Sequence, residues 1–321
     1  MTLRRGLCEI RVIGYKRPDL LRRALGSLIN QTYQNWRALV FDDSPEQEGK
    51  KVVEELGDER IVYSPNLERL GQVKNIAKAF SPHSFLGDAE YATILEDDNY
   101  YLSEYLEKNI NLFRDRKCNI LQSNARMAVL RATGEELLQD RFTLSPIYGT
   151  NMREIEFRER LGNILLNHAI GAGGLIWRLN RGINLQSAGE LYNSVVAEKL
   201  KALSTRESFL FNPKALLVFT VFEGEGEDSK PRALWESRRF RRSELSLARR
   251  VIREMGKDGV KSLLDREKEV GEGVVLRLAE SGSIAALLRL RFSRKNIVRL
   301  SKALLLWILF PLQTIDGNHS S

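Results

Sequence analysis

The sequence holds few of the residues that cross-link a chain or bind a structural metal. Its 321 residues include only 2 cysteines and 3 histidines. Two thiols cannot build a disulfide framework, and a structural zinc site made from them would also need carboxylate ligands. We therefore expect an ordinary apolar core, and Cys8 and Cys118 are consistent with a reducing compartment.

Long hydrophobic runs are also missing. No segment reaches the roughly 18–20 uninterrupted apolar residues that span a bilayer. The N-terminal segment carries Glu9 and Arg11 inside its only apolar stretch, so we expect no signal peptide. With 8 prolines, 43% apolar residues and no low-complexity tract, the chain is typical of a globular protein with one large α/β domain and an appendage, or with two domains.

The positive charge is confined to one end of the chain. Residues 230–321 contain 20 Lys and Arg against 10 Asp and Glu, whereas residues 1–229 contain 30 against 32. The whole positive excess behind the net charge of +8 therefore lies in the C-terminal part. We expect this basic surface to serve a purpose separate from the chemistry.

The first hundred residues alternate between short apolar strands and amphipathic helices. We expect strands at residues 9–15, 37–43, 60–64 and 91–98, with helices at 20–31, 49–56 and 73–80. This alternation predicts a mostly parallel central sheet flanked by helices on both faces. Further helices are expected at 104–117 and 191–203, and further strands at 119–130, 171–179 and 215–223.

The acidic, glycine-rich segment 224–228 is typical of a linker. Beyond it, residues 238–255 and 283–312 show helical patterns rich in basic residues. We therefore expect two domains, a catalytic domain at residues 1–225 and a basic helical C-terminal extension at residues 226–321.

Polar groups follow three of the expected strands where each one ends. Gly14 and Tyr15 end the first strand, Asp42 and Asp43 end the second, and a run of three acids at residues 96–98 ends the fourth. Ligands bind at the carboxyl ends of the strands in such sheets, so we expect one site built from these three strand ends.

The three adjacent acids Glu96, Asp97 and Asp98 repel one another, and a divalent cation would relieve that repulsion. Mg²⁺ or Mn²⁺ takes one or two protein carboxylates, with phosphates and waters as further ligands, and would neutralise a pyrophosphate leaving group. The alternative is a solvated acidic turn.

Three other polar residues have two interpretations each. Asp42 and Asp43 could accept hydrogen bonds from a ribose hydroxyl or a base, or could simply form a turn or a helix cap. Lys74 could reach a phosphate with Asn75 beside it, or could be an ordinary surface lysine.

Six short motifs follow one another along the first hundred residues. They are Gly14-Tyr15-Lys16-Arg17-Pro18, Gln31-Thr32-Tyr33, residues 36–44, Asn66 with Gly71, Lys74-Asn75, and Glu96-Asp97-Asp98. In this order and spacing the chain resembles the family 2 glycosyltransferases of the GT-A fold, a Rossmann-like α/β architecture. Residues 167–180 extend the likeness to about residue 220.

The resemblance implies a role for each matching residue. Tyr15 and Arg17 would line a nucleotide pocket, Asp42 would contact the base and Asp43 the ribose. Asn66, Lys74 and Asn75 would lie near the base and the phosphates, and Asp97 would also contact the donor. Asp98 would be the first metal ligand, with Glu96 as a second. Glu96 departs from the family, which usually has Asp at this position.

The resemblance also implies a general base ahead of the helix that follows residues 171–179. Glu190 occupies that region, and Glu156 and Glu198 are competitors. The alternative for Glu190 is an acid favoured by the helix dipole. A histidine often found after the last strand is missing, and the signature of processive synthases is not evident.

The C-terminal segment 303–312 lacks charge and follows six basic residues, from Arg289 to Lys302. It could be an anchor at an anionic membrane surface, or a helix that packs on the catalytic domain or on another copy. The aromatic residues of the whole C-terminal part, from Trp235 to Phe310, do not show the spacing of a nucleic-acid motif, so no nucleic acid is expected.

We therefore expect a metal-dependent, inverting, non-processive glycosyltransferase that takes a sugar from a nucleoside diphosphate sugar, UDP-linked by preference, to an acceptor hydroxyl. It would be cytoplasmic, with a peripheral contact on the inner face of the membrane as an option. The alternatives are a sugar-nucleotide nucleotidyltransferase, and a non-catalytic protein that retains the fold.

Overall fold

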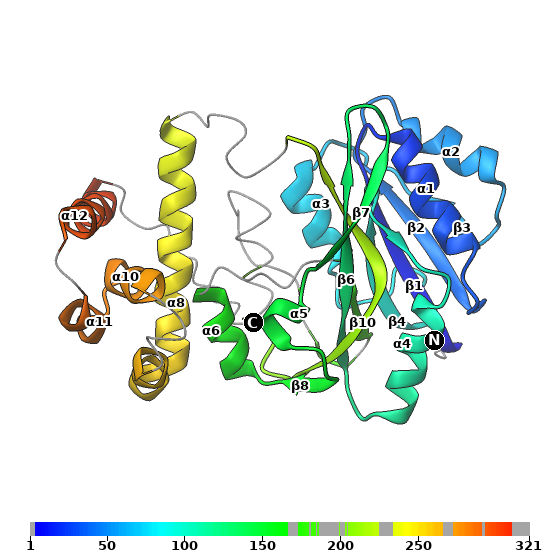
Figure 1. The fold of residues 1–321 in the computed structure, drawn as a ribbon. Coiled ribbons are helices and arrows are strands. Elements are labelled where there is room, and N and C mark those ends of the chain that lie inside the picture. Colours follow the sequence, from blue (N-terminus) through cyan, green and yellow to red (C-terminus); the bar gives the residue numbers. More distant parts are fainter. Residues whose placement is uncertain are drawn as a thin grey trace. The chain divides into compact units, whose positions relative to one another are not determined.

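The computed structural model describes residues 4–165, 173–179, 181–183, 185, 199, 203, 205–224, 234–265, 272–290 and 293–309. The chain forms two compact units (Figure 1). Unit 1 comprises residues 1–156, 171–186 and 205–230, and unit 2 comprises residues 157–170, 187–204 and 231–321. The predicted boundary after residue 225 stays a prediction, and the units differ from it by grouping residues 157–165 with the C-terminal helices.

Unit 1 is built around one mixed sheet. Its strands are β1 (Arg4–Gly14), β2 (Trp36–Asp42), β3 (Ile61–Tyr63), β4 (Ala89–Glu96), β5 (Tyr100–Tyr101), β6 (Ile120–Leu130), β7 (Glu136–Phe142), β8 (Arg153–Ile155), β9 (Leu175–Arg178) and β10 (Phe209–Phe222). Its helices are α1 (Pro18–Ile29), α2 (Glu48–Leu56), α3 (Gly71–Ala79), α4 (Tyr105–Asp115) and α5 (Ser145–Tyr148). The predicted α/β class with a central sheet flanked by helices is confirmed.

The sheet order is β3-β2-β1-β4-β9-β6-β10-β5, with β7 paired to β6 and β8 to β10. Strands β1 to β4 are mutually parallel where they pair, whereas β9 runs antiparallel to both β4 and β6. In register, Gly14 lies opposite Asp42, and Ile13 opposite Glu96. The three polar strand ends therefore meet at one edge of the sheet, as the sequence predicts.

The alternation of side chains along β1 assigns the helices to two faces. Cys8, Ile10 and Val12 are buried in a core with residues of α1, α2 and α4. Arg11 points the other way and donates hydrogen bonds to the carbonyl oxygens at the end of α3, including that of Ala79 at 2.8 Å. Helix α3 thus covers the face opposite α1, α2 and α4 (Figure 1).

Unit 2 is helical in its described part. Its helices are α6 (Phe157–Leu165), α8 (Leu234–Asp265), α10 (Glu272–Glu280), α11 (Ile284–Arg289) and α12 (Arg294–Leu309). The predicted C-terminal helices are present, although Leu290, with φ −72° and ψ 131°, breaks the expected helix 283–312 between α11 and α12. None of the helices in the described ranges combines the length and the apolarity needed to cross a bilayer.

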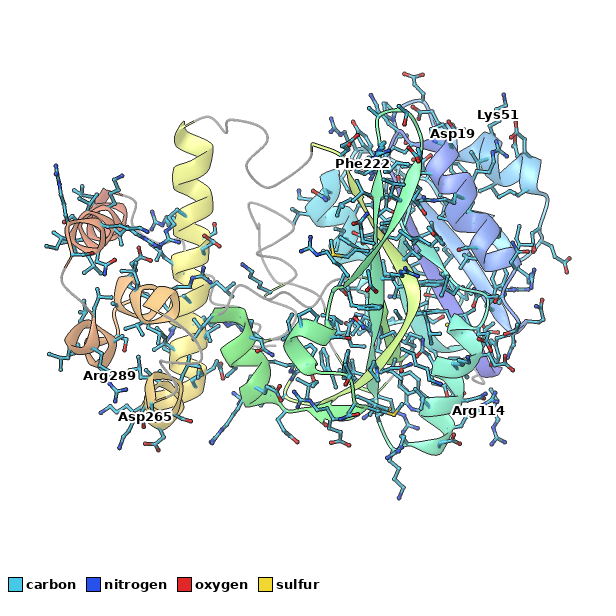
Figure 2. All side chains as sticks on the ribbon, in the orientation of Figure 1. Asp19, Lys51, Arg114, Phe222, Asp265 and Arg289 are labelled. Atoms are coloured by element: carbon cyan, nitrogen blue, oxygen red, sulfur yellow. The ribbon has the colours of Figure 1, made fainter. Side chains whose placement is uncertain are left out.

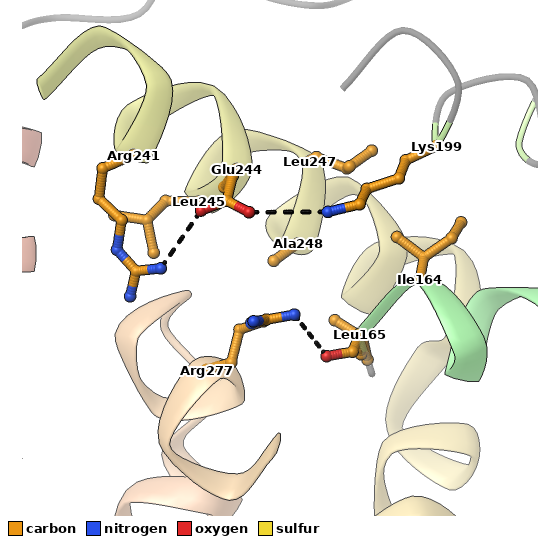
Figure 3. A pocket seen from close by; sticks show the side chains of 9 residues that line it. All are labelled: Ile164, Leu165, Lys199, Arg241, Glu244, Leu245, Leu247, Ala248 and Arg277. Carbon is orange, nitrogen blue, oxygen red and sulfur yellow. Dashed lines mark hydrogen bonds and ion pairs between the residues drawn. The ribbon is translucent and has the colours of Figure 1, made fainter. Parts of the chain in front are cut away.

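Ion pairs join the helices of unit 2 around a small interior space (Figure 3). The buried Lys199 ammonium lies 3.6 Å from Glu244, which also pairs with Arg241 at 3.5 Å. Arg277 on α10 donates a 2.7 Å hydrogen bond to the carbonyl oxygen of Leu165. Burial lowers the pKa of the Arg277 guanidinium, with Glu244 acting in the opposite direction. These contacts tie α6, α8 and α10 together.

Candidate active site

A cavity of about 320 Å³ opens where β1, β2 and β4 end. Seven of the residues predicted from the sequence line it: Tyr15, Arg17, Asp43, Asn75, Glu96, Asp97 and Asp98. Asp42, Asn66 and Lys74 do not. The structure therefore brings most of the predicted donor-binding residues together, although they come from segments more than 80 residues apart in the chain.

The three acids at the end of β4 occupy different environments. Glu96 is partly buried and accepts a 3.0 Å hydrogen bond from the Asn99 side chain. Asp97 is buried and accepts a 3.0 Å hydrogen bond from the backbone N–H of Tyr15. The Asp98 side chain retains 20% exposure. Asp98 is thus the more accessible of the two aspartates.

Arg17 neutralises both aspartates. Its guanidinium lies 2.8 Å from an oxygen of Asp97 and 2.8 Å from an oxygen of Asp98, while its own side chain remains 40% exposed. Burial alone would lower the pKa of Arg17, but the nearby carboxylates, Asp97 first, outweigh it and raise that pKa. Burial raises the pKa of Asp97 to about 7, against the opposing influence of Arg17 and of the Tyr15 N–H.

Arg23 on α1 stabilises the backbone of the acidic turn at residues 96–98. It donates a 2.5 Å hydrogen bond to the carbonyl oxygen of Asp98 and a 3.1 Å hydrogen bond to the hydroxyl of Thr220 on β10. It also pairs with Glu136 on β7 and lies 4.8 Å from the ring centroid of Tyr100. Arg23, which no sequence motif singles out, thus fixes the backbone of the acidic turn.

Asp43 faces the cavity but is itself anchored by a loop. Its carboxylate accepts hydrogen bonds from the backbone N–H groups of Leu70 (2.7 Å) and Gly71 (2.8 Å), and from the side chain of Asn66 (3.0 Å). Gly71 has a φ of 75°, a left-handed conformation that glycine adopts without strain. The loop ahead of α3 is therefore fastened to the end of β2.

The side chain of Asp42 points into the protein interior. It accepts hydrogen bonds from the N–H of Ser44 (2.9 Å), the N–H of Gly49 (3.0 Å) and the hydroxyl of Tyr63 (2.9 Å). A Cβ at position 49 would lie 2.7 Å from the Asp42 carboxylate, so glycine is needed there. The geometry gives Asp42 the task of ordering the start of α2, and its predicted contact with a base stays a prediction.

Asn66 links Asp43 to Asn75 through hydrogen bonds of its side-chain amide. The Asn66 side-chain amide donates to the Asn75 side-chain oxygen (3.1 Å), and the Lys78 ammonium donates to the Asn66 oxygen (2.8 Å). Burial lowers the pKa of Lys78, while Asp43 acts in the opposite direction. Lys74, the predicted phosphate contact, is exposed on α3 outside the cavity lining.

Two polar residues of the cavity were not predicted from the sequence. Arg69 and Gln72 line the space, and the Arg69 guanidinium lies 5.0 Å from the ring centroid of Tyr15. A cation held over an aromatic face gives a weak attraction that also fixes the ring. Their place in the loop and first turn before Lys74 is the signal that could have identified them, since that segment enters the site as a unit.

The candidates for a general base are not brought together in the described residues. Glu190 and Glu198 lie outside them. Glu156 is exposed between β8 and α6. Within the described part of the chain, no cluster of three or more Asp, Glu, His or Cys side chains is arranged to hold a metal. The oxygen donors at residues 96–98 nevertheless suit a hard divalent cation whose other ligands come from a substrate.

Comparison with known proteins gives a consistent picture. Residues 10–174, about half of the chain, match the model of glycosyl transferase family 2. The chain is 28% identical to Protein CgeD of Bacillus subtilis (strain 168) over 135 residues, which are 40% of this chain and 32% of CgeD.

Solved structures of S. aureus TarS share the fold. The structure of TarS 1–349 in complex with UDP-GlcNAc matches with a TM-score of 0.57 and 14% identity, over 94% of this chain and 89% of that one. A longer TarS chain matches with a TM-score of 0.56 and 15% identity, over 94% of this chain and 53% of that one. The chain thus spans about a third of CgeD and about half of the longer TarS chain. The predicted GT-A fold is confirmed.

Proposed function

Because the chain belongs to glycosyl transferase family 2, we propose that it transfers a sugar from a nucleoside diphosphate sugar, UDP-linked by preference, to an acceptor hydroxyl. The observation that carries the proposal is the cavity at the three strand ends, which combines an aromatic ring at Tyr15, a cation at Arg17 and the acids at 96–98. TarS, which shares the fold, has been solved with UDP-GlcNAc and with UDP, and this supports a uridine nucleotide as donor.

Different residues of the cavity can bind different parts of the donor. The Tyr15 ring, held by Arg69, offers a surface on which a planar base can stack. Asp43 and Asn75 lie at the end of β2 and on α3 and can accept hydrogen bonds from hydroxyl groups. Arg17 can exchange its aspartate partners for a phosphate, since a guanidinium binds both kinds of anion with paired hydrogen bonds. Asn66 orders Asp43 and Asn75, and we expect Lys74 to approach the donor only along the cavity rim.

A divalent Mn²⁺ or Mg²⁺ ion fits the donor set. We propose that Asp98, the more exposed aspartate, holds the ion with help from Glu96, while Asp97 keeps its hydrogen bond to Tyr15 and contacts the donor. When bound, such an ion supplies charge neutralisation for the departing diphosphate. Arg23 keeps the backbone of the acidic turn in place.

The stereochemical course and the base complete the proposal. We propose an inverting, single-addition reaction in which Glu190 accepts the proton of the acceptor hydroxyl, with Glu156 and Glu198 as the competing assignments. The acceptor would be a glycan or another hydroxyl compound. We also propose a cytoplasmic protein whose basic helical C-terminal part contacts a surface outside the catalytic domain.

The decisive experiment follows release of nucleoside diphosphate from a panel of nucleotide sugars with and without Mn²⁺. Asp98→Ala should lower the metal-dependent turnover by about 10²–10³, the usual cost of losing one electrostatic stabiliser of a transition state. Asp115→Ala, at the exposed end of α4, is a matched control that should retain turnover. If Asp98→Ala kept full metal-dependent turnover, the assignment of this carboxylate would be wrong, and no turnover with any donor would favour a non-catalytic protein.

A further inference from the structure

Helices α11 and α12 expose an unusual number of apolar side chains. In the described part of the chain, 13 large apolar residues are exposed, and six of them fall within residues 284–305. They are Ile284, Leu288, Ile297, Val298, Leu304 and Leu305. Scattered exposed apolar residues are normal on a soluble surface, but a concentration of them marks a place of interaction.

The spacing of these residues shows that they belong to continuous faces. On α12, Ile297 and Leu304 are seven residues apart, as are Val298 and Leu305, so each pair lies on one side of the helix. Asn296 and Ala303 have the same spacing and are buried, which assigns the opposite side to the packing within unit 2. On α11, Ile284 and Leu288 follow the i, i+4 rule and are 73% and 83% exposed.

The charges on these helices all have one sign. Residues 284–309 contain six Lys and Arg and no Asp or Glu. Arg294, Lys295 and Lys302 on α12 are exposed beside the apolar stripe. Arg289 differs, because it pairs with Asp265 at 2.8 Å (Figure 2). We call the six apolar side chains together with Arg294, Lys295 and Lys302 the α11–α12 surface.

We propose that the α11–α12 surface docks on an anionic lipid bilayer. Basic side chains at the edge of an apolar helix face contact phosphate headgroups, while the apolar side chains enter the boundary of the acyl chains. A second copy of the chain fits less well, since a symmetric interface would bring two acid-free basic patches together. The inference goes beyond the proposed sugar transfer and is independent of it.

The test uses the full chain and sedimentation with two kinds of vesicle, phosphatidylcholine alone and phosphatidylcholine mixed with phosphatidylglycerol. The protein should bind the mixed vesicles, and binding should weaken as salt is added. The triple variant Arg294→Gln, Lys295→Gln and Lys302→Gln should bind on the order of 100-fold less tightly, because each cation near such a surface contributes roughly fivefold.

A matched control separates the surface from net charge. The triple variant Arg253→Gln, Lys257→Gln and Lys261→Gln removes one Arg and two Lys from exposed positions of α8. It should retain binding to within about threefold, because these side chains lie on α8 and are not part of the α11–α12 surface. Equal losses in the two triple variants would overturn the proposal.

The apolar part is tested by the double variant Leu304→Ser and Leu305→Ser. Residual binding at high salt should disappear in this variant, since the remaining attraction is then apolar. If the wild-type chain instead ignored both vesicles and formed a dimer that this variant dissociates, the surface would be a contact between copies and the proposal would be wrong. Donor turnover without lipid should be unchanged in all these variants, so a failure here is distinct from a failure of the transfer reaction.

Discussion

Strand β1 carries one ion pair in its middle and leads into a second one at its carboxyl end, and the two differ in their exposure to solvent. Glu9 and Arg11 have fully buried side chains 2.8 Å apart. Arg17 instead meets Asp97 and Asp98 at the same distance while 40% of its side chain is exposed. Similar residues at similar distances therefore make one closed pair and one open one.

The closed pair has no spare hydrogen-bonding capacity. Arg11 also donates to the carbonyl oxygens of Ala79 (2.8 Å), Ser81 (2.6 Å) and His83 (2.7 Å). Glu9 accepts from the Ser84 hydroxyl and from the N–H groups of the next two residues, Phe85 and Leu86. The pair fastens the segment between α3 and β4, and no ligand could replace either partner. The open pair can exchange partners, which is the property that a substrate site needs.

The largest effect should follow from breaking the closed pair. Arg11→Met leaves the Glu9 carboxylate buried without its counter-ion, and we expect the free energy of unfolding to fall by about 3–5 kcal/mol. Urea unfolding followed by circular dichroism measures this loss. The double variant Glu9→Leu with Arg11→Met removes the stranded charge and should recover part of it. A loss below about 1 kcal/mol in Arg11→Met would show that the pair behaves like a surface one.

An intermediate effect is expected at the open pair, with opposite signs for two ligands. Arg17→Gln frees the aspartates, so Mn²⁺ alone should bind more tightly, while UDP should bind about tenfold more weakly for want of a charged phosphate contact. The free energy of unfolding should fall by less than in Arg11→Met, because Asp98 stays partly exposed and the buried Asp97 keeps its hydrogen bond from the Tyr15 N–H. Isothermal titration calorimetry measures both affinities.

Arg69→Gln is the matched control for this experiment, because Arg69 lines the same cavity and lies over Tyr15. It should weaken UDP binding without tightening that of Mn²⁺. An unchanged Mn²⁺ affinity in Arg17→Gln would argue against Asp98, the aspartate that Arg17 releases for the metal, as a ligand of the ion.

The smallest effect on stability is expected for an ion pair that is exposed to solvent and lies outside the cavity. Lys108 and Glu104 form an i, i+4 pair on the exposed side of α4, with 36% and 50% of their side chains accessible. Lys108→Gln should cost only about 0.3–0.5 kcal/mol, and the difference should vanish at high salt. A loss that survived high salt would mean that exposure is a poor guide to the strength of these pairs.

Local pattern was sufficient for most of the sheet. The strands predicted at 9–15, 37–43, 60–64 and 91–98 correspond to β1 to β4, because each is an apolar run bounded by turn residues. The last strand, expected at 215–223, instead begins at Phe209 and passes through Pro213 with a shift of register against β6. Pro213 has no N–H to donate to a strand ladder, and the structure accommodates it at this irregularity.

Short and exposed elements were missed. Strand β7 carries Glu136, Asp140 and Arg141 and is largely exposed, so it lacks the apolar signature of a buried strand. Strand β8 has three residues, which is too few for any period. Both owe their conformation to pairing with β6 and β10. The predicted helix 191–203 and the base Glu190 fall outside the described residues and stay predictions.

The sequence by itself determined the family, the first four strands and the acids that end two of them, because these depend on apolar periodicity and on short motifs. Only the tertiary structure decided that Arg17 pairs with acids 80 residues away, that Asp42 faces the interior while Asp43 faces the cavity, and that α11 and α12 turn apolar side chains to solvent. The physical reason is that the partners of a charged or apolar side chain are set by whatever packs against it, and that neighbour usually comes from a distant part of the chain.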